Sequence, residues 1–140
     1  MKSGFFCFIG VLALAAILPA GCGKPMYEDG VYTGRSGRDD TGAWGEVTIT
    51  ITGQRVTGCR FITRQKDGTI KDENYGKVNG EISNQDYYDK AQLAVRAMEH
   101  YAMMYRETGD LKKVDAIGGA TIAFDQFTEA VELALKNAKK

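Results

Sequence analysis

A run of alternating apolar and polar side chains restricts the fold of this chain more than any other feature. Residues 46–52 read Glu-Val-Thr-Ile-Thr-Ile-Thr, and this two-residue period is typical of a strand with one buried face. Residues 53–54, Gly-Gln, form a two-residue connection, and Gly at its first position favours a type II′ turn. Val56–Arg64 is the expected return strand, with Cys59 and Phe61 facing the core. The sequence therefore predicts an antiparallel hairpin.

Weaker signals surround this hairpin. Val31–Thr33 is a brief β-prone stretch closed by Gly34, and residues 35–45 are a polar, glycine-rich loop. Asp67-Gly68 predicts a turn after the hairpin. Residues 72–84 show no clear period, so no element is predicted there.

Two amphipathic helices complete the pattern. Residues 86–108 repeat apolar side chains at steps of three and four, with Ser83 or Asn84 as the cap and Gly109 at the end. The expected apolar stripe of this helix is Tyr87, Ala91, Ala94, Met98, Tyr101 and Tyr105. The expected apolar face of the second helix is Phe124, Phe127, Val131 and Leu135, with Ala130, Ala134 and Ala138 beside it. The predicted fold is α+β, with an antiparallel β-hairpin sheet packed against two helices.

Composition excludes several classes of protein. Lys plus Arg and Asp plus Glu both number 18, so the formal net charge is zero. A nucleic-acid binder normally carries a basic surface, and none is indicated here. The chain has three cysteines and one histidine, too few for a disulfide scaffold or a typical zinc site.

The first 21 residues have the pattern of a signal peptide. Phe5 to Leu18 is apolar or small throughout, which is too short to span a bilayer but suits the apolar region of such a signal. Leu18-Pro19-Ala20-Gly21-Cys22 then resembles the lipobox of bacterial lipoproteins. This resemblance implies cleavage before Cys22, a lipid on Cys22, and anchoring at the extracytoplasmic side of the cell membrane. An ordinary cleaved signal with a chance cysteine is the alternative.

Few residues outside the second helix suggest chemistry. His100 is expected at a helix surface, and Cys59 as a small core residue. Asp39-Asp40 could touch a cation but lacks the spacing of a calcium loop. Trp44 could stack on a planar ligand or close the end of the sheet.

The segment before the second helix is more informative. It reads Asp115-Ala116-Ile117-Gly118-Gly119-Ala120-Thr121, which places Thr121 at or near the helix N-cap. A simple reading is a glycine turn followed by a threonine cap. A helix start also presents unpaired N–H groups that favour a phosphate, and glycines let a large ligand approach the backbone.

These motifs together resemble the FMN-binding domain family, over roughly Asp29 to Ala138. The resemblance lies in the opening Asp29–Gly34, the hairpin, and the Val114–Thr121 segment. The family includes the flavin subunits of sodium-pumping quinone reductases and Rnf complexes, and the chain is similar to its major membrane immunogen-type lipoproteins. The lipobox implies residues 1–21 as signal peptide and 22–29 as lipidated tether, and the family resemblance implies 30–140 as the FMN-binding domain.

The resemblance also implies the site. In the family, a flavin transferase esterifies FMN to the threonine of an Asp-x-x-Ser/Thr-Gly-Ala-Thr motif, which is Thr121 here. Asp115, Gly119 and Ala120 match this motif, whereas Gly118 stands where Ser or Thr is usual. These five residues are the expected cofactor-binding residues.

The expected function is that of a membrane-anchored flavoprotein. It would relay electrons between a membrane reductase, quinone-linked or flavin-based, and another acceptor, with covalent FMN as cofactor. The residues suit an electron carrier better than an enzyme with its own substrate. The alternative is a flavin-free ligand-binding or surface-interaction lipoprotein with the same fold.

Overall fold

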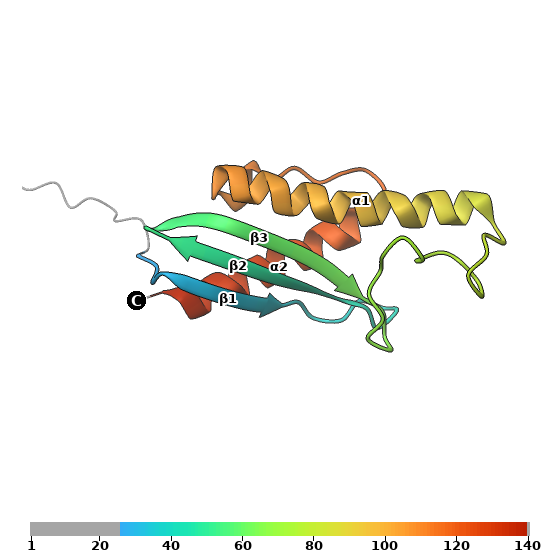
Figure 1. The fold of residues 1–140 in the computed structure, drawn as a ribbon, viewed down its shortest axis with the longest axis horizontal. Helices are drawn as coiled ribbons and strands as arrows, with labels where there is room; N and C mark the ends of the chain where they lie inside the picture. The colour runs from blue at the N-terminus through green and yellow to red at the C-terminus, as the bar shows by residue number, and fades with distance from the viewer. Residues whose placement is uncertain (1–25, 140) are drawn as a thin grey trace, which may run out of the picture.

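The computed structural model describes residues 26–139, which form three strands and two long helices (Figure 1). The predictions for the signal peptide and for Cys22 lie outside these residues. The elements in chain order are β1 (Gly30–Arg35), β2 (Trp44–Thr52), β3 (Arg55–Arg64), α1 (Gln85–Thr108), the 3-10 helix η1 (Leu111–Lys113) and α2 (Thr121–Ala138). The predicted α+β fold is confirmed.

The sheet is antiparallel with the order β1-β2-β3. Val47, Ile49 and Ile51 are buried on one face of β2, as the alternation predicts. On β3, Phe61 pairs with Val47 and is buried, while Cys59 pairs with Ile49 and is only half-buried. β1 is longer than expected because its pairing with β2 continues through Gly34 to Arg35.

The connection between β2 and β3 is a type I′ turn, so the type II′ prediction was wrong. Gly53 and Gln54 both have positive φ, at 57° and 65°, whereas a type II′ turn has positive φ only at the first residue. The Gln54 side chain holds the backbone of Tyr27, because its Oε1 accepts a 2.8 Å hydrogen bond from Tyr27 N and its Nε2 donates to Tyr27 O. These contacts hold Gln54 in a conformation that its own preference disfavours.

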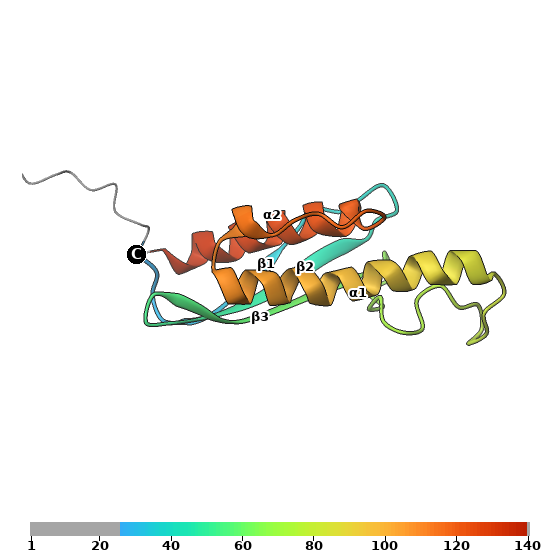
Figure 2. The ribbon, with the colours of Figure 1, turned by 90° about the horizontal axis from the view of Figure 1, so that it is seen from above.

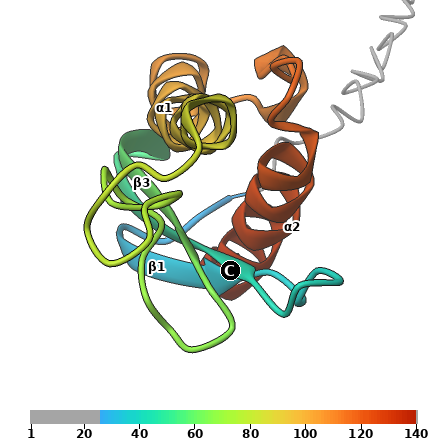
Figure 3. The ribbon, with the colours of Figure 1, turned by 90° about the vertical axis from the view of Figure 1, so that its right-hand side faces the viewer.

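Both helices lie on the same face of the sheet (Figures 2 and 3). α1 runs along β3, and α2 crosses β1 and β2. Gly34 allows α2 to approach, since a Cβ atom there would lie 1.8 Å from the carbonyl oxygen of Ala130. On α2, Ala130 and Ala134 are fully buried together with the predicted Phe127 and Val131, whereas the predicted Phe124 and Leu135 are only partly buried.

α1 begins one residue earlier than predicted, at Gln85, and ends at Thr108 as predicted. Asn84 is the N-cap and accepts a hydrogen bond from Tyr87 N, and Gly109 is the left-handed C-cap. Tyr87 was placed in the apolar stripe, yet its side chain is 54% exposed. The first turns of α1 extend past the end of the sheet, so Tyr87 has no strand beneath it (Figure 1).

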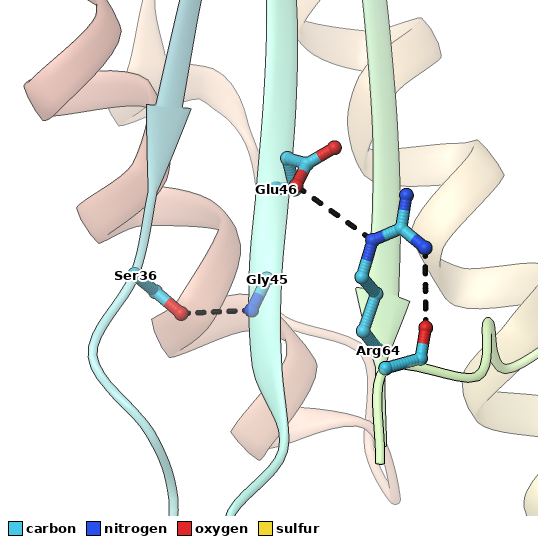
Figure 4. A network of polar contacts seen from close by, with 5 residues as sticks. Ser36, Gly45, Glu46 and Arg64 are labelled. Carbon is cyan, nitrogen blue, oxygen red and sulfur yellow. Dashed lines mark hydrogen bonds and ion pairs between the residues drawn. The ribbon is translucent and has the colours of Figure 1, made fainter. Parts of the chain in front are cut away.

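A polar network fixes the end of the sheet where β2 begins and β3 ends (Figure 4). The buried Ser36 hydroxyl accepts a 2.8 Å hydrogen bond from Gly45 N. Arg64 lies 3.7 Å from Glu46 and donates to the carbonyl oxygen of Gly68 at 3.2 Å. Arg64 thus ties the predicted turn at Asp67-Gly68 to the sheet.

Candidate functional site

The glycine turn before α2 is held by a buried tyrosine of α1. The Tyr101 side chain is fully buried, and its hydroxyl accepts a 2.9 Å hydrogen bond from Ile117 N. The same hydroxyl donates to the carbonyl oxygen of Ala120 at 3.3 Å. Two backbone groups on either side of Gly118-Gly119 are therefore fixed by one side chain.

The two glycines of this turn have different roles. Gly119 has a φ of +84°, and a Cβ atom there would lie 3.0 Å from Leu93 Cδ2, so the turn needs glycine at this position. A Cβ atom at Gly118 would meet nothing within 4 Å. The backbone therefore accommodates the serine or threonine that the resemblance expects at Gly118.

Thr121 is the first residue of α2 and does not cap it. The N-cap is Ala120, which has no side-chain hydrogen bond. The reading of Thr121 as a threonine cap is therefore wrong. Because no side chain caps this helix, the N–H groups of its first turn remain available to a ligand. The Thr121 side chain is exposed beside them.

A cleft of about 280 Å³ lies next to Thr121, between α1, α2 and the end of the sheet. The predicted residues Gly119, Ala120 and Thr121 line it, whereas Asp115 and Gly118 do not. Both of the latter are exposed. The other lining residues are Asp39, Thr41, Thr63, Lys71, Tyr75, Ala94, Val95, Met98, Ile122, Ala123 and Gln126.

Lys71 reaches the cleft because the chain doubles back after β3. The turn at Asp67-Gly68 pairs Ile70 with Arg64, and Lys71 N then donates a 2.8 Å hydrogen bond to Thr63 O. Tyr75 is held by Gln92 of α1, whose side-chain nitrogen donates to the carbonyl oxygens of Tyr75 at 2.9 Å and of Asp72 at 3.1 Å.

These cleft residues were not predicted from the sequence. The segment from Lys71 to Tyr75 shows no hydrophobic period, and its position depends on hydrogen bonds to distant residues. The turn signal at Asp67-Gly68 was the one clue that the chain returns toward β3.

The cleft carries two charged side chains of opposite sign. Burial lowers the pKa of the Lys71 ammonium, and the nearby Asp39 carboxylate opposes this effect. Partial burial raises the pKa of Asp39, but hydrogen bonds from Thr41 and Ala43 and the charge of Lys71 lower it overall. Burial and the neighbouring Tyr87 raise the pKa of Tyr75 to about 12, so this phenol stays protonated near neutral pH.

Gln126 is a buried amide that lines both this cleft and a second pocket beside residues 37–41. Its Nε2 donates to Asp39 Oδ2 at 3.2 Å and to the carbonyl oxygen of Ala43 at 3.3 Å. Two acceptors fix the orientation of the amide, because the flipped form would place its oxygen against both. Its Oε1 has no partner among the described residues.

Two further candidates from the sequence, Trp44 and His100, do not line the cleft. The Trp44 side chain is buried, and the guanidinium groups of Arg35 and Arg38 each lie 4.1 Å from its ring centroid. Trp44 therefore closes the sheet end and leaves no free face for a planar ligand. His100 is exposed on α1 and does not line the cleft. Within residues 26–139, no group of three or more His, Cys, Asp or Glu could hold a metal ion.

Comparison with known proteins identifies a family. The family model described as FMN-binding domain matches residues 42–136. This range includes β2, β3, α1, the complete Asp115–Thr121 segment and α2 as far as residue 136. No curated protein matches the chain significantly. None of the helices in the described part of the chain is long and apolar enough to cross a membrane.

Two solved structures are similar to this chain, and one of them supports the fold. The crystal structure of the CPE2226 protein from Clostridium perfringens has a TM-score of 0.63 and 21% sequence identity, covering 81% of this chain and 89% of that chain. A solution NMR structure from Clostridium thermocellum has a TM-score of 0.46 and 22% identity, covering 81% of this chain and 93% of that one. At 21% identity, the Clostridium perfringens structure supports the fold and nothing further.

Proposed function

The chain belongs to the FMN-binding domain family, and from this premise we propose that it is an electron carrier with FMN esterified to Thr121. The observation that supports the covalent link best is the exposed Thr121 hydroxyl at an uncapped helix start beside a cleft. A threonine that is not needed as a cap is free to serve as an attachment point.

The phosphate of FMN fits the start of α2. The free N–H groups and the partial positive charge of a helix N-terminus stabilise an anion there. Gly119 keeps the backbone of the turn open, and Tyr101 holds it in place. These residues would therefore position the phosphoester independently of any contact that the protein makes with the flavin ring.

The flavin ring has an apolar wall available to it. Ala94, Val95 and Met98 of α1 line the cleft, and Ala123 of α2 lies beside them. Burial of one ring face against these side chains removes apolar surface from water. When bound, FMN supplies the reversible electron transfer, and the protein holds and tunes it.

Attachment requires a separate flavin transferase. In this step the Thr121 oxygen would bond to the phosphorus of the FMN half of FAD, its proton would pass to a base of the transferase, and AMP would leave as the pyrophosphate bond breaks. Asp39 lines the cleft but already accepts four hydrogen bonds, and His100 lies outside the cleft. Activation of the hydroxyl is therefore assigned to the transferase.

We extend the proposal to an extracytoplasmic position, with a lipid on Cys22 as the anchor. The first described residues lie beside the C-terminal end of α2, because Tyr27 pairs with Lys139. Thr121 is at the other end of this 18-residue helix, ~27 Å away. A tether before residue 26 would thus hold the site away from the membrane surface, toward a partner.

Covalent attachment suits such a position. A flavin bound with a micromolar Kd is held by ~8 kcal/mol and would be lost to a dilute exterior. A phosphoester prevents this loss. The electron donor in this proposal is a membrane reductase, either quinone-linked or flavin-based.

Co-expression with a flavin transferase tests the proposal. We expect yellow protein whose flavin fluorescence remains on the chain after denaturation, and no such fluorescence for Thr121→Ala. If wild-type protein stays colourless while a known family member becomes flavinylated in the same cells, the flavin-free lipoprotein is the better description.

A further inference from the structure

Lys71 is a half-buried cation without a paired carboxylate. The described part of the chain has one ion pair, Arg64–Glu46, so no carboxylate oxygen there lies within 4.0 Å of Lys71 Nζ. The ammonium instead lies 5.0 Å from the ring centroid of Tyr75. Partial burial of an ammonium without a counter-charge costs free energy, which an anionic ligand would offset.

Asp39 is the carboxylate whose charge acts on Lys71, and its oxygens already accept hydrogen bonds. Oδ1 accepts hydrogen bonds from Thr41 N at 2.9 Å, Thr41 Oγ1 at 2.6 Å and Ala43 N at 3.0 Å. Oδ2 accepts from Gln126 Nε2 at 3.2 Å. Asp39 therefore organises the loop and the start of β2, and the charge of Lys71 remains available to the cleft.

The position of Lys71 is fixed by the fold rather than by its own flexible side chain. Its backbone N–H bonds to Thr63 O at the end of β3, and the Thr63 hydroxyl bonds to Met98 Sδ at 2.8 Å in the core. Lys71, Thr63 and Met98 all line the cleft that contains Thr121. A ligand attached at Thr121 and lying in this cleft meets Lys71.

We propose that Lys71 contacts the N1–C2=O edge of the flavin ring and stabilises its reduced, anionic form, thereby raising the midpoint potential. This inference rests on the proposed function. On reduction, two electrons from an external donor and one proton enter the ring, an N5–H bond forms, and the negative charge remains at N1–C2=O. A cation at that edge stabilises the reduced ring more than the neutral oxidised one.

The test compares flavin-loaded full-length variants. Lys71→Met removes the charge but keeps a side chain of similar length, and Lys71→Arg keeps the charge. Lys136→Met is the matched control, because it makes the same change in net charge on the exposed last turn of α2. Intact mass first establishes that each variant carries one FMN. The midpoint potential is then measured by equilibration with a reference dye during reduction by dithionite.

Sulfite provides a second, spectroscopic readout. It forms a bond from sulfur to N5 of the oxidised ring, and the electron pair moves to N1–C2=O, giving the same local negative charge. We expect Lys71→Met to bind sulfite about tenfold more weakly, equivalent to ~1.4 kcal/mol. Bleaching of the oxidised flavin absorption band reports the bound fraction.

The outcomes separate this inference from the proposed function. A lower midpoint potential and weaker sulfite binding in Lys71→Met, with Lys71→Arg and Lys136→Met close to wild type, support it. Equal values in Lys71→Met and wild type would overturn it, as would equal shifts in Lys71→Met and Lys136→Met. Wild-type protein without flavin contradicts the proposed function instead.

Discussion

The hydroxyl of Tyr101 and the backbone N–H of Ile117 are joined by a 2.9 Å hydrogen bond that links the middle of α1 to the glycine turn before α2. The same hydroxyl bonds to Ala120 O, one residue before Thr121. One buried side chain therefore links the core of the protein to the segment that ends in the candidate attachment residue.

Loss of the Tyr101 hydroxyl should loosen the turn. In Tyr101→Phe, Ile117 N and Ala120 O lose their shared partner, which costs about 1–3 kcal/mol of unfolding free energy. Urea denaturation measures this cost, and hydrogen exchange measures faster opening of residues 115–121. Tyr105→Phe is the control. Tyr105 is as buried on α1 as Tyr101, but the hydrogen bonds to the turn come from Tyr101. Equal exchange in the turn of both variants would show that the Tyr101 hydroxyl does not hold it.

The two glycines of the turn should respond differently to alanine. Gly119→Ala places a side chain at a φ of +84° and 3.0 Å from Leu93, so we expect a loss of about 1–2 kcal/mol. Gly118→Ala meets open space and should leave the urea midpoint nearly unchanged. Similar losses in both variants would contradict the backbone conformation described here.

Gly118→Ser should increase flavinylation. The change restores the commoner family pattern, and the structure has room for the side chain. The flavin fluorescence per chain after limited co-expression with a transferase measures the effect, with Gly118→Ala as the control for loss of glycine. A lower yield in Gly118→Ser than in wild type would show that the hydroxyl at this position does not aid the transferase.

The Cys59 thiol should react slowly and make stability fall at high pH. Burial raises its pKa from 9.0 to about 12 in the folded chain. As pH rises above 9, the unfolded thiol ionises first, so the free energy of unfolding falls between pH 9 and 12. Urea denaturation over this range, compared with Cys59→Ala, isolates the contribution. Peptide mapping after iodoacetamide treatment follows Cys59 itself, and rapid labelling of the native protein would contradict its placement.

The sequence predicted the elements whose pattern is local. The alternation in residues 46–52 sets the buried face of β2, and the glycines near Thr121 mark the start of α2. The turn at Gly53-Gln54 was assigned the wrong type because Gln54 is held by Tyr27, which lies 27 residues earlier. Such a contact leaves no periodic signal.

Only the part of the site that is continuous in sequence was predicted. The motif that ends in Thr121 is continuous in sequence and could be recognised, although the reading of Thr121 as a cap was wrong because the helix begins one residue earlier than that reading requires. Lys71 and Tyr75 enter the cleft through hydrogen bonds to Thr63 and Gln92. Partners that lie in separate elements become apparent only in the folded structure.

The most direct test of the phosphoester is peptide mapping of wild-type protein made with a working flavin transferase. We expect one FMN, less one water, on the peptide that contains Thr121, with fragment ions that place it on the Thr121 hydroxyl. Thr121→Ser should keep partial modification because the nucleophile remains. Thr121→Ala should lose the modification while its free energy of unfolding in urea stays within about 0.5 kcal/mol of wild type, because Thr121 is exposed and caps nothing. Flavin on another residue, or an unmodified Thr121 peptide beside a flavinylated family member, would contradict the assignment.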